Sequence, residues 1–132
     1  MTEQNNPFHK KKSGVFFFKS SNPYEFYDLL NGIDMEPKQD VWGTLIFPEN
    51  AKLPCPVIVP IHGSAGLREG HHTHMVNLLE AGFAVFRIHH FESRGVISIV
   101  ENQTQVTLAT MITDAFRALA LLNKHPDIDK DK

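Results

Sequence analysis

The feature that most constrains the fold is an apolar run, residues 57–61 (VIVPI), that ends in a glycine-bearing segment, residues 62–66 (HGSAG). A continuous apolar run of this length is typical of a strand that helices cover on both faces. Glycines directly after such a strand allow the backbone to turn sharply. The pattern therefore predicts a strand that turns into a helix. Pro60 predicts irregular pairing near the end of that strand, because proline cannot donate to a ladder.

Residues 71–88 continue the alternation of helix and strand. Residues 71–81 carry apolar side chains at helical spacing, and Gly82 follows them where a left-handed residue commonly ends a helix. Residues 83–88 (FAVFRI) have the branched and aromatic content of a strand. A strand–helix–strand unit almost always joins parallel strands through a right-handed crossover. The sequence therefore predicts an α/β fold with a doubly wound sheet.

The longest predicted helix covers residues 102–124. Asn102 is a candidate cap, Gln105 follows three residues later, and apolar residues recur along one face. Asp114 and Arg117 fall toward the opposite face, where we expect contact with water.

The first part of the chain predicts an antiparallel addition to the sheet. Residues 1–13 are polar and lack periodicity, so we expect a disordered leader before one domain, or part of one, at residues 14–132. Residues 15–19 (VFFFK) and 24–27 (YEFY) are β-prone runs separated by a turn-favouring segment, which predicts a hairpin. Residues 41–47 (VWGTLIF) predict a further strand.

Length and composition exclude several classes of protein. A chain of 132 residues is long enough for one core and too short for two. The net charge of −2 gives no basic field that would attract nucleic acid or anionic lipid. The apolar run at residues 16–18 is too short for a signal peptide or a membrane span, so we expect a soluble, cytoplasmic protein. The single cysteine, Cys55, excludes an internal disulfide and a cysteine-based metal set.

The turn at residues 62–66 has two interpretations. Backbone N–H groups at the end of a strand can stabilise the oxyanion that develops when an ester or lactone carbonyl is attacked. A purely structural strand-to-helix turn needs the same glycines. The Ser64 hydroxyl, two residues from His62, is not by default a nucleophile, because a base must reach it and be oriented by a third group.

Four segments, taken in order, resemble dienelactone hydrolase-type α/β-hydrolases. They are residues 42–48 (WGTLIFP), the strand that ends in HGSAG, residues 80–85 (EAGFAV) and residues 91–95 (FESRG). The resemblance covers about residues 40–132 and implies the N-terminal half of a doubly wound hydrolase sheet. It implies that the amides of Ser64 and Ala65 belong to an oxyanion hole and that His62 organises the turn. It also implies that Arg94 borders the substrate pocket.

The resemblance implies that the nucleophile is not in this chain. The family carries Ser or Cys on an elbow after the next strand, followed by an acid and a histidine. Gly66 and Gly70 have the elbow's spacing, but Arg68 stands between them. We therefore expect a fragment that needs no cofactor and is inactive alone toward a small ester or lactone. Its strand at residues 57–61 would have an open edge, which predicts self-association or a complementing C-terminal fragment, reached through a connection at residues 125–132.

Histidines near the expected ends of the strands permit another function. His71, His72 and His74 lie at the predicted helix start, and His89 and His90 follow a strand. Ligands bind near this edge of α/β sheets. However, no nearby residues complete the three or four ligands of a zinc site, so we assign no metal ligand. The alternatives that stay open are a non-catalytic module that binds a small ligand or metal, and one half of a split hydrolase.

The segment after the strand at residues 83–88 offers three interpretations. His89 and Glu92 would make a general acid–base pair. Alternatively, Glu92 and Arg94 pair with each other on a solvated loop. The planar fork of Arg94 also suits a substrate carboxylate, which is the use that the resemblance implies.

Overall fold

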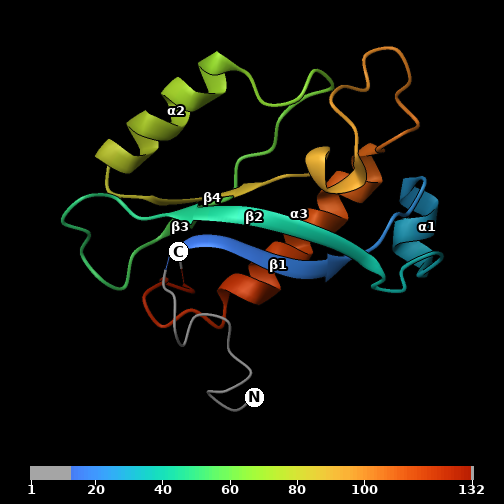
Figure 1. Ribbon diagram of the computed structural model, residues 1–132. Helices are drawn as coiled ribbons and strands as arrows, with labels where there is room; N and C mark the ends of the chain where they lie inside the picture. Colours follow the sequence, from blue (N-terminus) through green and yellow to red (C-terminus); the bar gives the residue numbers. More distant parts are fainter. Residues whose placement is uncertain (1–12, 132) are drawn as a thin grey trace.

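The structure is a computed structural model that describes residues 13–131 (Figure 1). All but the last residue of the expected leader, residues 1–13, lies outside this range. The elements in chain order are β1 (Gly14–Ser20), α1 (Phe26–Asn31), β2 (Gln39–Ile46), β3 (Val57–Ile58), α2 (Glu69–Glu80), β4 (Ala84–Ile88), the 3-10 turn η2 (Glu92–Arg94) and α3 (Leu108–Leu122). Helix α2 lies over one face of the sheet and α3 crosses the other (Figure 1).

The four strands form one mixed sheet in the order β1-β2-β4-β3. Strands β3 and β4 are parallel, as the strand–helix–strand pattern predicted. The pairs β1–β2 and β2–β4 are antiparallel, which confirms an antiparallel N-terminal part. The described residues thus form a small α/β domain with a mixed sheet.

The predicted hairpin at residues 15–27 is wrong. Strand β1 pairs along its whole length with β2 instead. Residues 24–27 lead into α1, where the carboxylate of Asp28 accepts a hydrogen bond from the Tyr24 amide at 3.2 Å. Gly32, with φ +69°, ends this helix. Local capping therefore overrides the β propensity of the aromatic residues.

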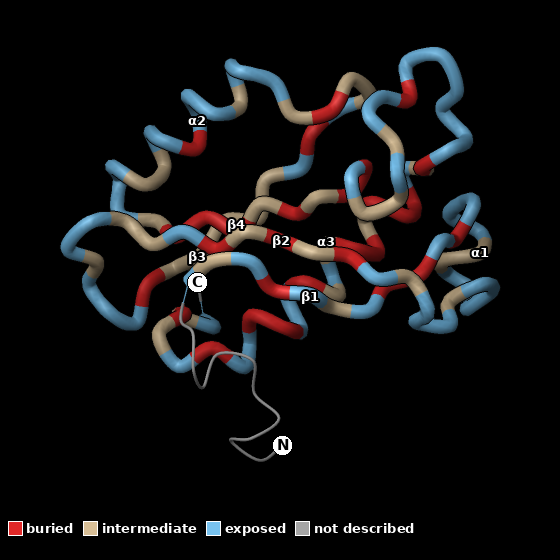
Figure 2. The backbone as a smooth tube through the Cα atoms, viewed as in Figure 1, coloured by how far each residue is buried: buried red, intermediate tan, exposed pale blue. Residues whose placement is uncertain are grey.

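The main core lies between the sheet and α3 (Figure 2). Alternate residues of β1 and β2 point toward it, and the intervening ones face the other side of the sheet. Phe86 of β4 is fully buried, and its ring lies directly over Gly43 of β2. A Cβ at position 43 would come within 2.3 Å of that ring, so only glycine leaves room for it.

Three predictions about the central strand–helix unit have different outcomes. Gly82, with φ +97°, follows α2 as predicted. Strand β3 stops at Ile58, which agrees with irregular pairing around Pro60. The expected burial of this strand on both faces is wrong, because β3 lies at the edge of the sheet and Val57 and Ile58 are only half-buried.

Helix α3 differs from its predicted form at its start and on its polar side. Its cap is Thr107, whose hydroxyl accepts a hydrogen bond from the Thr110 amide, and not Asn102. Asp114 is fully buried, so its expected place on a wet face is wrong. The cause is a set of buried partners around this carboxylate, described below.

The chain returns to the sheet after α3. The Cys55 amide donates to the carbonyl of Asp127 at 2.8 Å, and the Asp129 amide donates to the carbonyl of Cys55 at 2.8 Å. This parallel bridge lies on the side of β3 away from β4, because the next carbonyl, that of Pro56, bonds to Ala84. The chain therefore runs from α3 back to the edge of the sheet, and its continuation into a further strand stays a prediction. No helix in residues 13–131 combines the length and the hydropathy needed to cross a bilayer.

Candidate active site

The turn after β3 is a tight one closed at both ends by glycine. The Gly66 amide donates to the Gly63 carbonyl at 3.0 Å, so Ser64 and Ala65 are its two central residues. Gly66 has φ +82°, and a Cβ there would lie 3.0 Å from the carbonyl oxygen of Ile97. Both the backbone conformation and the close neighbour therefore require glycine at position 66.

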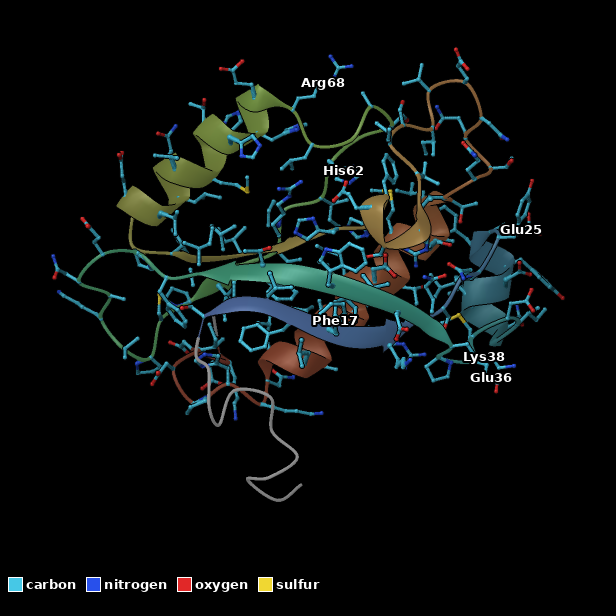
Figure 3. The ribbon with its side chains drawn as sticks, viewed as in Figure 1. Phe17, Glu25, Glu36, Lys38, His62 and Arg68 are labelled. Atoms are coloured by element: carbon cyan, nitrogen blue, oxygen red, sulfur yellow. The ribbon has the colours of Figure 1, made fainter. Side chains whose placement is uncertain are left out.

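His62 lies beneath this turn (Figure 3) and is 7% exposed. Its Nδ1 donates to the Gly63 carbonyl at 2.9 Å, which leaves Nε2 as a hydrogen-bond acceptor. The ring packs edge-on against Phe91, with centroids 4.4 Å apart, and lies 5.4 Å from the ring of His90. Burial lowers the pKa of His62 below 6.5, so the neutral ring is favoured. A neutral imidazole holds the first carbonyl of the turn in place.

A pocket of about 300 Å³ opens beside the turn. It is lined by His62, Gly63, Ser64, Ile99, Gln103, Thr107, Leu108 and Met111. Within residues 13–131, the amides of Ser64 and Ala65 have no acceptor. Donors that are left unsatisfied beside a cavity are available to an anionic oxygen.

The Ser64 hydroxyl is not activated in this structure. It donates to the side-chain oxygen of Gln103 at 2.9 Å. The backbone carbonyl of Ser64 accepts a hydrogen bond from the Ile99 amide at 2.8 Å, which fixes the turn against the loop before α3. The side-chain oxygen of Gln103 is not a general base, so it does not turn the Ser64 hydroxyl into a nucleophile. The role expected for Ser64 therefore stays that of its backbone N–H, as a donor to an oxyanion.

Asp114 is the centre of a buried polar network. Its two carboxylate oxygens accept from Arg94 Nη1 and Nη2 at 2.7 and 2.8 Å. They also accept from His90 Nδ1 at 2.7 Å and from the Ser20 hydroxyl at 2.5 Å. Burial alone would raise the pKa of Asp114, but the hydrogen bonds from His90 and Arg94 and the Arg94 charge outweigh it and lower that pKa below 3.8. The carboxylate is therefore ionised and paired.

Arg94 uses all its N–H groups inside the protein. Besides the two bonds to Asp114, its Nε donates to the Asn22 side chain at 2.7 Å, and its Nη groups donate to the carbonyls of His90 and Ser21. The guanidinium has five donors, and these five bonds occupy them. To bind a substrate carboxylate, as the family resemblance implies, Arg94 would have to give up one of these partners.

The alternatives for the segment after β4 are now distinguishable. The expected pairing of Glu92 with Arg94 is wrong, since Arg94 bonds to Asp114. Glu92 instead accepts from His89 Nδ1 at 2.7 Å, and His89 Nε2 accepts from the Thr44 hydroxyl at 2.9 Å. Sequence reasoning did not single out Thr44, because its proximity depends on the register of β2 against β4.

His71, at the start of α2, makes a local contact. His71 Nδ1 accepts from the Arg68 amide at 2.9 Å, as part of a cap on the helix. Among residues 13–131, no three histidine, cysteine or carboxylate side chains are grouped so that they could hold a metal ion. The structure thus describes His71 as a capping residue.

Comparison with known proteins adds no family assignment. Searches of protein-family models and of curated proteins found no match to this chain. The function must therefore be argued from the turn, the pocket and the sheet.

Proposed function

We propose that the chain forms the oxyanion-binding part of an ester or lactone hydrolase of the dienelactone hydrolase type. The amides of Ser64 and Ala65 would donate to the oxyanion, and His62 would keep the turn in shape. The pocket of about 300 Å³ would receive part of a small ester or lactone. The observation that carries the proposal is the pair of amides without acceptors among residues 13–131, in a turn whose first central residue, Ser64, lines that pocket.

The group that attacks the carbonyl would come from a segment that joins the sheet beside β3. Strand β3 is at the edge of the sheet, and residues 127–129 already pair with the start of its outer side. A parallel strand placed there would end near the turn at residues 63–66, because parallel strands share one carboxyl edge. A complementing C-terminal fragment or a separate chain would supply that strand. We propose that the complete enzyme acts in the cytoplasm.

The proposal is tested by binding of an oxyanion mimic. The monoethyl ester of methylphosphonic acid carries the tetrahedral shape and the charge of the intermediate. Titrated into the isotopically labelled protein, it should shift the amide resonances of Ser64 and Ala65 in a saturable manner. Shifts confined to other residues would contradict the proposal.

One substitution removes a proposed donor without removing the turn. Ser64 is the first central residue of the turn and has no positive φ, so proline is compatible with that position. A hydrogen bond to a charged group contributes about 1.5–3 kcal/mol, so Ser64→Pro should weaken binding by about 10- to 100-fold. Ser64→Ala keeps the amide. An equal loss in Ser64→Ala would assign the contact to the hydroxyl and overturn this assignment.

A further inference from the structure

The face of the sheet opposite the main core carries a second group of polar side chains. Thr44 of β2 lies directly opposite Arg87 of β4 in the antiparallel register, and the amide of His89 bonds to the carbonyl of Trp42 at 2.9 Å. Phe17 of β1, labelled in Figure 3, is the cross-strand partner of Trp42 and is 65% exposed. Helix α2 lies over the β4 side of this face (Figure 1), so the β1–β2 side is the part that a small molecule can reach, and Thr44 there is half-buried.

The side chains of Thr44, His89 and Glu92 form a continuous hydrogen-bonded chain. The carboxylate of Glu92 can only accept, so His89 Nδ1 carries the proton in their 2.7 Å bond. His89 Nε2 then has a free lone pair, and the Thr44 hydroxyl donates to it at 2.9 Å. The Trp42 ring stacks on the His89 ring, with the ring centroids 6.0 Å apart and an angle of 28° between the ring planes, and this contact holds the imidazole in place. A hydroxyl, an imidazole and an orienting carboxylate within these distances meet the geometric requirement for an activated nucleophile.

A cation with an unpaired donor stands opposite Thr44 on the neighbouring strand. Arg87 Nε is buried and has no hydrogen-bond partner among the described residues. Its Nη2 lies 3.7 Å from Glu92. Because directly opposed residues of an antiparallel pair have Cβ atoms about 5 Å apart, the Arg87 side chain is within reach of a group attached to Thr44. Arg87 is thus placed to stabilise negative charge that develops there.

We propose that Thr44 is the nucleophile of a second site, and that it accepts an acyl group from small activated esters. The Thr44 oxygen attacks the ester carbonyl carbon while His89 Nε2 takes the hydroxyl proton. The tetrahedral oxyanion lies against Arg87, and it collapses with cleavage of the bond to the leaving oxygen, which takes up the proton from His89. Water, activated by the same imidazole, then hydrolyses the acyl-threonine to the free acid. The site is separate from the turn at residues 63–66 and gives the chain a nucleophile of its own, contrary to the expectation that it is inactive alone.

The experiment uses the full chain and p-nitrophenyl acetate. We expect a release of p-nitrophenolate together with acetylation that peptide mass spectrometry maps to Thr44. General base catalysis is worth about 10²- to 10⁴-fold, so His89→Gln should slow this acetylation by a factor in that range. Thr44→Val should abolish it, and Thr44→Ser, which keeps a hydroxyl, should restore it. Thr73→Val, on the exposed side of α2, serves as the matched control and should acetylate Thr44 at the wild-type rate.

The outcomes distinguish a catalytic role of Thr44, His89 and Glu92 from a purely structural set of hydrogen bonds. Acetylation confined to lysines, or acetylation of Thr44 that is unchanged in His89→Gln, would overturn the proposal. Thermal unfolding of each variant establishes that it is folded. If Thr44→Val does not fold, the comparison of His89→Gln with Thr44→Ser decides the question in the same way.

Discussion

The hydrogen bonds of Asp114 join parts of the chain that are far apart in the sequence. Its carboxylate accepts from Ser20 of β1, from His90 after β4 and from Arg94 of η2. A buried charge of this kind is tolerated only when its hydrogen-bonding capacity is filled. The network therefore fixes where α3 lies against the sheet.

We expect Asp114→Asn to be strongly destabilising. The substitution leaves the buried Arg94 charge without its counter-ion, and breaking one partner of a buried pair costs about 3–5 kcal/mol. Urea unfolding at pH 7 measures the loss. Asp28→Asn, which alters a half-buried carboxylate with a single amide partner, is the matched control and should cost less than about 1 kcal/mol. Equal losses in the two variants would contradict the structural role given to Asp114.

The same substitution has a defined pH dependence. The folded-state pKa of Asp114 is lowered, so its stabilisation is complete above the unfolded value of about 3.8 and is lost as the pH falls through the folded-state value. The difference in unfolding free energy between wild type and Asp114→Asn should therefore be constant near neutral pH and shrink in acid. Urea titrations at successive pH values measure this difference. A difference that grows on acidification would have the wrong sign.

At the scale of the elements, the packing of β2 on β4 depends on a missing side chain. A methyl group at position 43 would meet the Phe86 ring at 2.3 Å. Gly43→Ala should therefore destabilise the protein by about 1–3 kcal/mol, the usual cost of overpacking. Gly70→Ala is the control, since a Cβ on Gly70 of α2 would have no atom within 4 Å, and alanine is the better helix former. Chemical denaturation compares the two, and no loss in Gly43→Ala would show that the ring moves freely.

Elements with local signals were predictable from the sequence. Helix α2 and strand β4 were predicted to within about two residues of their bounds, because Gly82 separates two clear patterns. Helix α1 was missed because its aromatic residues favour strand, whereas its capping contacts are visible only in three dimensions. The cap of α3 was placed at Asn102 instead of Thr107 for the same reason.

The polar networks depend on contacts that no local pattern carries. Asp114 reads as a surface residue on a helical projection, and its partner Ser20 is 94 residues away. The contact of Thr44 with His89 requires the register of two antiparallel strands that are 45 positions apart at this point. The turn at residues 62–66, in contrast, was predictable because its two glycines lie only three positions apart, directly after an apolar run.

At the scale of the whole molecule, α3 keeps exposed apolar side chains and one edge of the sheet has little pairing. Phe116 and Leu119 of α3 are 67% and 44% exposed, and β3 presents an edge with little pairing. Unpaired edges and exposed apolar residues favour association. We expect sedimentation velocity to show concentration-dependent self-association, weakened by Phe116→Glu. Val76→Glu, on the exposed side of α2, should associate like wild type, and a monomer at all concentrations would contradict the prediction.

The bond from Ser20 to Asp114 also sets an order of events during translation. Strand β1, with Ser20, leaves the ribosome long before Asp114, which accepts the hydrogen bond from the Ser20 hydroxyl, has been synthesised. Phe16, which is 5% exposed in the finished molecule and belongs to the cluster completed by α3, is without that cover on the nascent chain. Non-local contacts of this kind form slowly. The interval before α3 emerges is therefore when the apolar side chains of β1 face water on the nascent chain.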